Sequence, residues 1–171
     1  MSHSRVGRAL RGEPGVLTIE LATRMASVLG LELSVTLHPS GDPVRDKSHL
    51  ALLERFRARL PASIRWRTEV PMPIEGDRRS ADAVIDSTGW VALVEAETRV
   101  DDVQALERKI NLKQRDLALG RVILVVADTR HNRAVVERVP ALKERFPVST
   151  RACLAALGVG RDPGGDALVI L

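Results

Sequence analysis

The spacing of apolar residues predicts both helices and strands in the first forty residues. Thr18 opens a segment in which apolar residues recur every three or four positions as far as Gly30, as on one face of an amphipathic helix. Residues 31–37 instead alternate between apolar and polar, which is typical of a strand with one buried face. Residues 38–43 contain Pro, Ser and Gly. They resemble a linker, so we expect a domain boundary near residue 40.

Beyond this linker, helical and strand patterns alternate. Helices are expected over residues 44–60, 100–117 and 129–139 and from Ser149 onward, and strands over residues 64–70, 82–85, 91–97, 121–127 and 168–171. Residues 121–127 are almost entirely apolar, as in a strand buried on both faces. The order predicts an α/β fold in which a mixed sheet is flanked by helices, with hairpins first and then a helix that returns to a parallel strand. A small helical segment would precede this domain.

Three acidic residues stand at the ends of two predicted strands. Asp82 opens one strand, Glu95 and Glu97 close the next, and a Ser87–Gly89 turn separates the strands. Because the strands of a hairpin run antiparallel, the three carboxylates should lie at one end of it. Carboxylates held close together repel unless a cation or a proton lies between them, which predicts a divalent metal site with Asp82 and Glu95 as ligands and Mg²⁺ as the candidate ion.

Ordinary structural roles are the alternative for each acid. Asp82 could end a turn by accepting backbone hydrogen bonds, and Glu97 could be a solvated acid at a strand edge. Glu95 interrupts an apolar run, where an unpaired charge is costly, so a purely structural role fits it less well. A further polar segment, residues 128–133, follows the apolar strand. It could contribute to a site at the end of the sheet, although helix capping by Asp128 or Thr129, with an exposed His131, explains it more simply.

Composition narrows the classes of function. The 171 residues are 44% hydrophobic and 28% charged, as in ordinary globular proteins, and a net charge of +4 is compatible with binding a phosphate backbone without requiring it. Aromatic residues make up only 2% and Tyr is absent. This argues against binding of single-stranded nucleic acid by base stacking and excludes tyrosine chemistry. The chain has no long apolar run and no apolar leader, so we expect a cytoplasmic protein without membrane partners. Cys153 is expected to be a buried bystander.

The opening segment resembles a helix-turn-helix regulator of the xenobiotic-response-element (XRE) type. Ser4-Arg5-Val6, Arg11-Gly12-Glu13 and residues 18–31 take the places of a Ser-Arg-rich recognition helix, a loop and the helix that follows it. Only the later part of such a domain is matched, so the start is expected to be truncated or to use a later initiator Met. The resemblance implies that residues 1–38 bind DNA through Arg5, Arg8 and Arg11 and that the protein forms a homodimer. The alternative is a helical arm packed on the next domain.

Residues 44 to about 130 resemble the PD-(D/E)XK, or restriction-endonuclease-like, superfamily. Its signature is an acid at the start of one strand and (D/E)-x-K at the end of the next. Asp82 and Glu95 take the two acid positions, whereas Glu97 stands where the family usually has Lys. The resemblance extends the nuclease-like domain over residues 44–171. It implies that Asp82, Glu95 and the carbonyl of Ala96 hold Mg²⁺, which activates a water molecule and stabilises charge on the scissile phosphate.

Another residue must then supply the positive charge that the Lys of this family usually provides. Some members carry Glu at this position and some shift the Lys to the following helix, where this chain offers Gln104, Arg108, Lys109, Lys113 and Arg115; Arg99 lies just past the strand. Arg78 and Arg79 precede Asp82 and could contact phosphate or pair with the acids. Two functions stay open. One is an XRE-type transcriptional regulator or antitoxin-like factor with a nuclease-like domain, which the missing Lys favours. The other is a metal-dependent DNA endonuclease, which Asp82 and Glu95 favour.

Overall fold

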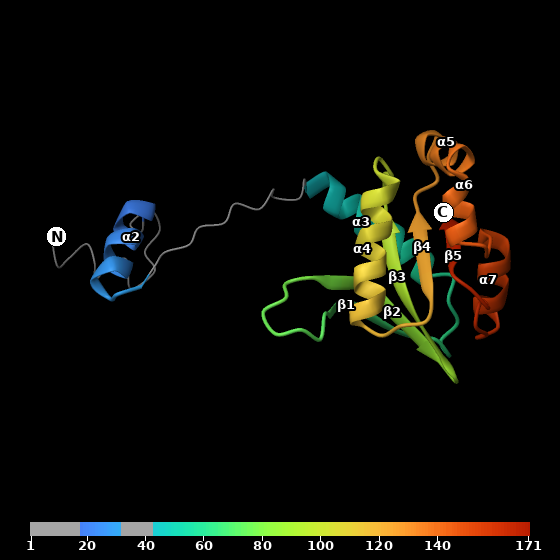
Figure 1. The fold of residues 1–171 in the computed structure, drawn as a ribbon. Coiled ribbons are helices and arrows are strands. Elements are labelled where there is room, and N and C mark those ends of the chain that lie inside the picture. Colours follow the sequence, from blue (N-terminus) through green and yellow to red (C-terminus); the bar gives the residue numbers. More distant parts are fainter. Residues whose placement is uncertain (1–17, 32–42) are drawn as a thin grey trace. The chain divides into compact units, whose positions relative to one another are not determined.

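The chain divides into two units, residues 1–40 and 41–171, and each is described by itself. The computed structural model describes residues 18–31 and 43–171 (Figure 1). The predicted helix at the N-terminus, with Arg5, Arg8 and Arg11, lies outside the described residues, as does most of the predicted strand over residues 31–37.

Helix α2 (Ile19–Val28) is the described part of the first unit, and it forms where the apolar spacing predicted it. The side chain of Thr18 caps it by accepting a hydrogen bond of 3.2 Å from the backbone N–H of Leu21. No residue of α2 is buried. Ile19 and Val28 are 68% and 81% accessible, whereas Ala22, Met25 and Ala26 of the apolar stripe are half-buried.

The second unit is an α/β domain, as predicted. Its elements in chain order are α3 (Pro43–Arg57), β1 (Arg65–Pro71), β2 (Ser80–Ser87), β3 (Trp90–Glu97), α4 (Val103–Asp116), β4 (Val122–Val126), α5 (Arg130–Arg138), α6 (Pro140–Arg145), α7 (Thr150–Gly158) and β5 (Ala167–Ile170). Helix α6 was not predicted from the pattern. It has Pro140 in its first turn, where the missing N–H of proline is tolerated. None of the helices in residues 18–31 and 43–171 combines the length and apolar character needed to cross a membrane.

The five strands form one mixed sheet in the order β1-β2-β3-β4-β5 (Figure 1). Strands β1, β2 and β3 pair antiparallel, and β3, β4 and β5 pair parallel. The β2–β3 hairpin closes at the Ser87–Trp90 pair, and Gly89 in its turn has a positive φ of 83°, a conformation that favours glycine. Helix α4 then carries the chain from β3 to its parallel neighbour β4. The predicted hairpins and crossover are thus confirmed, and the strand order explains why the sheet is mixed.

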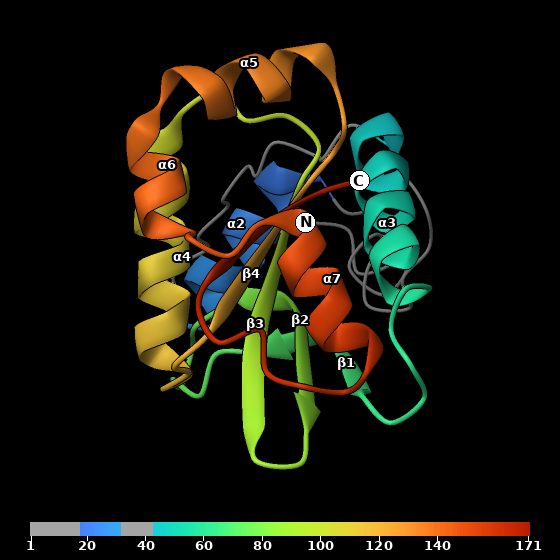
Figure 2. The same cartoon turned by 90° about the vertical axis from the view of Figure 1, so that its right-hand side faces the viewer.

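Helices cover both faces of the sheet (Figure 2). One core contains Phe56 of α3 and Leu157 of α7, and the other contains Ile110 of α4 and Leu142 of α6. Every residue of β4 is fully buried, and its side chains alternate between the two cores, as the apolar run over residues 121–127 predicted. Cys153 lies in the first core, where burial raises the pKa of its thiol to about 12 and keeps it protonated.

Candidate functional site

The three acidic residues predicted at the end of the hairpin do lie together. The last β2–β3 pair is Ala83 with Val94, and beyond it the carboxylates of Asp82 and Glu95 bond to the backbone of the opposite strand. The N–H of Asp82 donates to Oε1 of Glu95 at 3.2 Å, and the N–H of Ala96 donates to Oδ2 of Asp82 at 2.8 Å. Side chains thus replace the backbone ladder here, which fixes both carboxylates at the end of the sheet where β3 and β4 also finish.

Helix α4 places two ammonium groups over these acids. Nζ of Lys113 lies 2.8 and 2.7 Å from the two carboxylate oxygens of Glu95. Nζ of Lys109, one turn earlier, lies 2.9 Å from Oε1 of Glu97 and 3.3 Å from Oε2 of Glu95. The spacing of four residues brings both lysines to the same side of the helix, facing the sheet. Two of the side chains that were expected to replace the missing Lys, Lys109 and Lys113, therefore do lie beside the acids.

Burial differs sharply among the charged groups. Glu95 is fully buried and Lys113 is 5% exposed, so their ion pair is shielded from water. The side chain of Asp82 is 17% exposed, that of Glu97 26% and that of Lys109 41%. Glu97 is therefore not the freely solvated acid of the alternative interpretation, because it is half-buried and paired with Lys109. The site opens to solvent on the side of Glu97 and Lys109.

His49 of α3 is a further member of the cluster, which the sequence did not indicate. Its Nε2 lies 3.4 Å from Oδ2 of Asp82, and its side chain is 32% exposed. The hydrogen bond to Asp82 is the main reason why the pKa of His49 is raised, against the effect of burial. His49 and the N–H of Ala96 both contact Oδ2, whereas the charged group near Oδ1, within residues 18–31 and 43–171, is Lys113 at 4.0 Å.

The two central acids have pKa values shifted in opposite directions. Burial alone would raise the pKa of Asp82, but the hydrogen bonds from His49 and Ala96 N–H, with the charges of the two lysines, lower it. Burial, followed by repulsion from Asp82, raises the pKa of Glu95 despite the lysines. Burial would lower the pKa of Lys109, but the charges of Glu95 and Glu97 raise it above its usual range. One carboxylate is thus held firmly ionised beside another that accepts a proton more readily, a pattern common at catalytic sites.

A buried asparagine clamps the loop that leaves the site. Asn132, fully buried at the start of α5, donates to the carbonyls of Thr98 at 3.0 Å and Ala127 at 2.9 Å and accepts from the N–H of Val100 at 3.0 Å. Thr129 caps α5 by accepting from the N–H of Asn132, which confirms the capping interpretation of this segment. His131 is half-buried rather than exposed, with Nε2 lying 2.9 Å from the carbonyl of Val100.

The other predicted site residues lie apart from the acids. Gln104 is exposed in the first turn of α4, and Arg78 is exposed before β2. Arg79 pairs with Asp77 and Asp116, each at 2.6 Å, so it pairs with acids but not with those of the site. Arg99 pairs with Asp101 at 2.8 Å. It also lines a shallow pocket of about 220 Å³ that begins at Glu97 and Lys109 and lies beside the mouth of the site.

The carboxylate oxygens of the site suit a hard cation, although Lys109 and Lys113 already form ion pairs with Glu97 and Glu95. Carboxylate oxygens are the donors that Mg²⁺ prefers, and this ion uses one or two carboxylates while retaining water ligands. Within residues 18–31 and 43–171, no group of three or more His, Cys, Asp or Glu side chains is arranged to hold a metal ion. Asp82 and Glu95 would therefore provide a two-carboxylate site, in which Lys113 competes for Glu95.

Comparison with known proteins adds no family to this description. No protein family, curated protein or solved structure matches the chain. The fold and site define an α/β domain with a five-stranded mixed sheet and a cluster of acids and lysines at one end of it.

Proposed function

We propose that the second unit is a metal-dependent nuclease domain and that the protein binds DNA, with its N-terminal segment acting as part of an XRE-type helix-turn-helix. The observation that carries the proposal is the position of Lys109 and Lys113. They bring two positive charges to Asp82 and Glu95, where Glu97 replaces the expected Lys. Acids and cations therefore meet at one end of the sheet, as phosphodiester hydrolysis requires.

Each residue has a distinct role in this proposal. Asp82, through Oδ1, and Glu95 would hold Mg²⁺, which when bound supplies an activated water and neutralises phosphate charge. His49 orients the Asp82 carboxylate by bonding to its other oxygen. Lys113 favours the ionised form of Glu95 and so opposes the effect of burial on its pKa. Lys109 is the more exposed of the two lysines and would contact the phosphate of the substrate, while Glu97 orients Lys109 through their ion pair.

A non-catalytic regulator or antitoxin-like factor is the second candidate, and one observation favours it. Lys113 contacts both oxygens of a fully buried Glu95, so the charge of Glu95 is neutralised without a metal ion. In such a protein the cluster would hold β2, β3 and α4 together. DNA binding would then depend on the N-terminal segment, including Arg5, Arg8 and Arg11.

Cleavage of labelled DNA tests the nuclease proposal. The protein is incubated with plasmid and with single-stranded DNA in Mg²⁺, Mn²⁺ or EDTA, beside the variants Asp82→Asn and Glu95→Gln. Glu137→Gln is the matched control, because Glu137 is exposed on α5. We expect cleavage that needs metal, is lost in both site variants and is unchanged in the control. Absence of cleavage, or cleavage that persists in both site variants, would overturn the nuclease proposal, and the non-catalytic candidate would replace it.

A further inference from the structure

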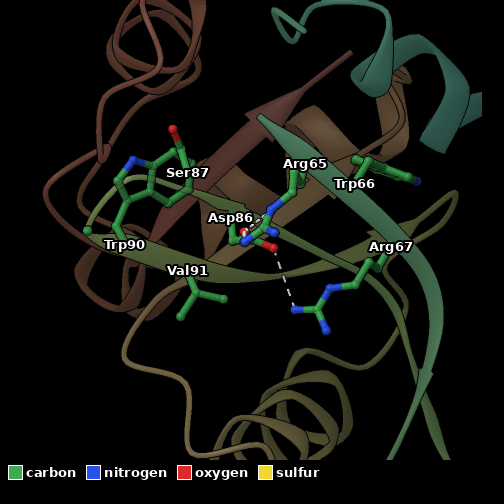
Figure 3. A pocket seen from close by; sticks show the side chains of 8 residues that line it. Arg65, Trp66, Arg67, Asp86, Ser87, Trp90 and Val91 are labelled. Atoms are coloured by element: carbon green, nitrogen blue, oxygen red, sulfur yellow. Dashed lines mark hydrogen bonds and ion pairs between the residues drawn. The ribbon is translucent and has the colours of Figure 1, made fainter. Parts of the chain in front are cut away.

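A second hollow, of about 830 Å³, lies around β1, β2 and the β2–β3 turn (Figure 3). Arg65 and Arg67 of β1 line it with Asp86 of β2, and Trp90 forms part of its wall (Figure 3). None of these residues belongs to the site described above. The hollow therefore needs its own explanation.

Asp86 neutralises only part of the positive charge in this hollow. Arg65 donates to Oδ2 of Asp86 from Nε at 2.8 Å and lies 2.6 Å from the same oxygen through Nη2. Arg67 stands further off, with Nη2 at 3.6 Å from Oδ1. Two guanidinium groups face one carboxylate, so the trio carries one excess positive charge.

The arginines are far more exposed than the acid they share. The side chain of Asp86 is only 13% exposed, whereas those of Arg65 and Arg67 are 82% and 57% exposed. A guanidinium has five N–H donors in a rigid fork. Asp86 lies near two nitrogens of Arg65 and one of Arg67, so further donors are available to an anion in the hollow. Phosphate oxygens match this fork better than they match a single ammonium group.

The hollow lies on the same strand as the acidic cluster. Asp82 and Asp86 are four residues apart on β2, so their side chains point to the same face, at a separation of about 13 Å for a rise of roughly 3.3 Å per residue. A polynucleotide chain spans such a separation within a few nucleotides. A strand with one phosphate at the acidic cluster would therefore bring a later phosphate to the arginines.

We propose that the hollow at Arg65 and Arg67 binds a phosphodiester group of a nucleic-acid strand whose scissile phosphate lies at Asp82 and Glu95. This inference rests on the proposed nuclease function for the identity of the ligand. It makes the exposed edge strand β1 the surface along which the nucleic acid is held. A purely structural role, in which the arginines only neutralise buried Asp86, is the alternative.

A substitution of Arg67 distinguishes binding of a phosphodiester from a purely structural role in neutralising Asp86. Because Arg65 makes the short contacts to Asp86, Arg67→Gln leaves the buried acid paired and should preserve the fold, which a thermal melt checks. Arg151→Gln is the control, since it removes the same charge from an exposed position on α7. Binding of a labelled 12-nucleotide single strand and of a 12-base-pair duplex is measured by fluorescence anisotropy in EDTA, over a range of salt concentrations.

We expect Arg67→Gln to weaken binding of one or both DNA probes by roughly three- to tenfold, and to lower the slope of log K against log salt by about 0.7 for the single strand or about 0.9 for the duplex. The DNA probe whose binding changes more shows whether the hollow holds single-stranded or double-stranded DNA. Equal binding by Arg67→Gln and Arg151→Gln would refute the inference. So would a result in which Arg67→Gln weakens binding of inorganic phosphate but not of either DNA. Because no cleavage is measured, loss of the nuclease proposal alone would leave an Arg67 effect intact.

Discussion

Lys113 and Glu95 form a buried ion pair in which one ammonium nitrogen lies 2.7 and 2.8 Å from the two oxygens of the carboxylate. Such a pair is costly to form, because both charges leave water, and more costly to break, because the remaining charge stays buried. The pair therefore ties α4 to β3 at the candidate site.

Removal of Lys113 should destabilise the domain strongly. We expect Lys113→Met to lower the free energy of unfolding by about 3 kcal/mol, because buried Glu95 loses its closest partner while Lys109 remains nearby. The double variant Glu95→Met, Lys113→Met should recover most of this loss, since apolar side chains of similar size can replace a buried pair. Urea denaturation measures both effects. A single variant as stable as the wild type would contradict the ion-pair interpretation.

Lys109 should affect catalysis more than stability. Its side chain is 41% exposed and points into the open side of the cluster, so Lys109→Gln should fold normally. If the domain is a nuclease, we expect cleavage to fall by about 100-fold, as when one donor to developing charge is lost. Initial rates of oligonucleotide cleavage in Mn²⁺ measure the effect. Lys143→Gln, at an exposed position on α6, is the matched control and should keep the wild-type rate.

The contact between His49 and Asp82 predicts a pH dependence of stability. The pKa of His49 is raised in the folded state, so its stabilising contribution is fully present below its ordinary value of 6.5 and is lost as pH rises through the higher folded pKa. Wild-type protein should therefore lose stability above pH 6.5 to a greater extent than His49→Gln. Asp82→Asn should flatten the same part of the profile, because it removes the main cause of the shift. Urea titrations between pH 5.5 and 8.5 give these profiles, and parallel curves for all three proteins would refute the assignment.

Asn132 should stabilise the loop after β3. Asn132→Ala leaves the N–H of Val100 and the carbonyls of Thr98 and Ala127 without their buried partner. We expect a loss of about 2–3 kcal/mol in unfolding free energy and faster hydrogen exchange at the amide of Val100. Asn111→Ala, an exposed position on α4, should change stability by less than about 0.5 kcal/mol. Unchanged exchange at Val100 would contradict the role of Asn132 as a clamp.

Local patterns were sufficient to predict most of the second unit. The short apolar runs of β2 and β3, with the turn between them, predicted that Asp82, Glu95 and Glu97 would lie at one end of the hairpin, and the hydrogen bonds between Asp82 and the opposite strand confirm it. Lys109 and Lys113 were among the five side chains that the following helix offers, but the pattern did not single them out as the partners of the acids. Gln104, another of these candidates, is exposed, because it lies on a different face of α4 from the buried Leu106 and Ile110.

Long-range contacts could not be predicted in this way. His49 reaches Asp82 from a helix that lies far earlier in the chain, and Asn132 bonds to a loop more than thirty residues before it. No spacing within one element signals such contacts, since they depend on how α3 and α5 pack against the sheet. Arg79 illustrates the same limit: proximity to Asp82 in sequence suggested a pair, but Asp77 and Asp116 provide better placed partners.

Strand β5 forms an edge of the sheet, yet its backbone donors are already used. Leu168 donates its N–H to the carbonyl of Val148 at 3.1 Å, and Ile170 donates to the hydroxyl of Thr150 at 2.9 Å. An exposed strand edge can pair with a strand from another molecule. Here the N–H groups that such pairing would need already form hydrogen bonds within the chain. A continuous sheet across two molecules is therefore disfavoured at β5, and a homodimer of this protein would have to associate through a different surface.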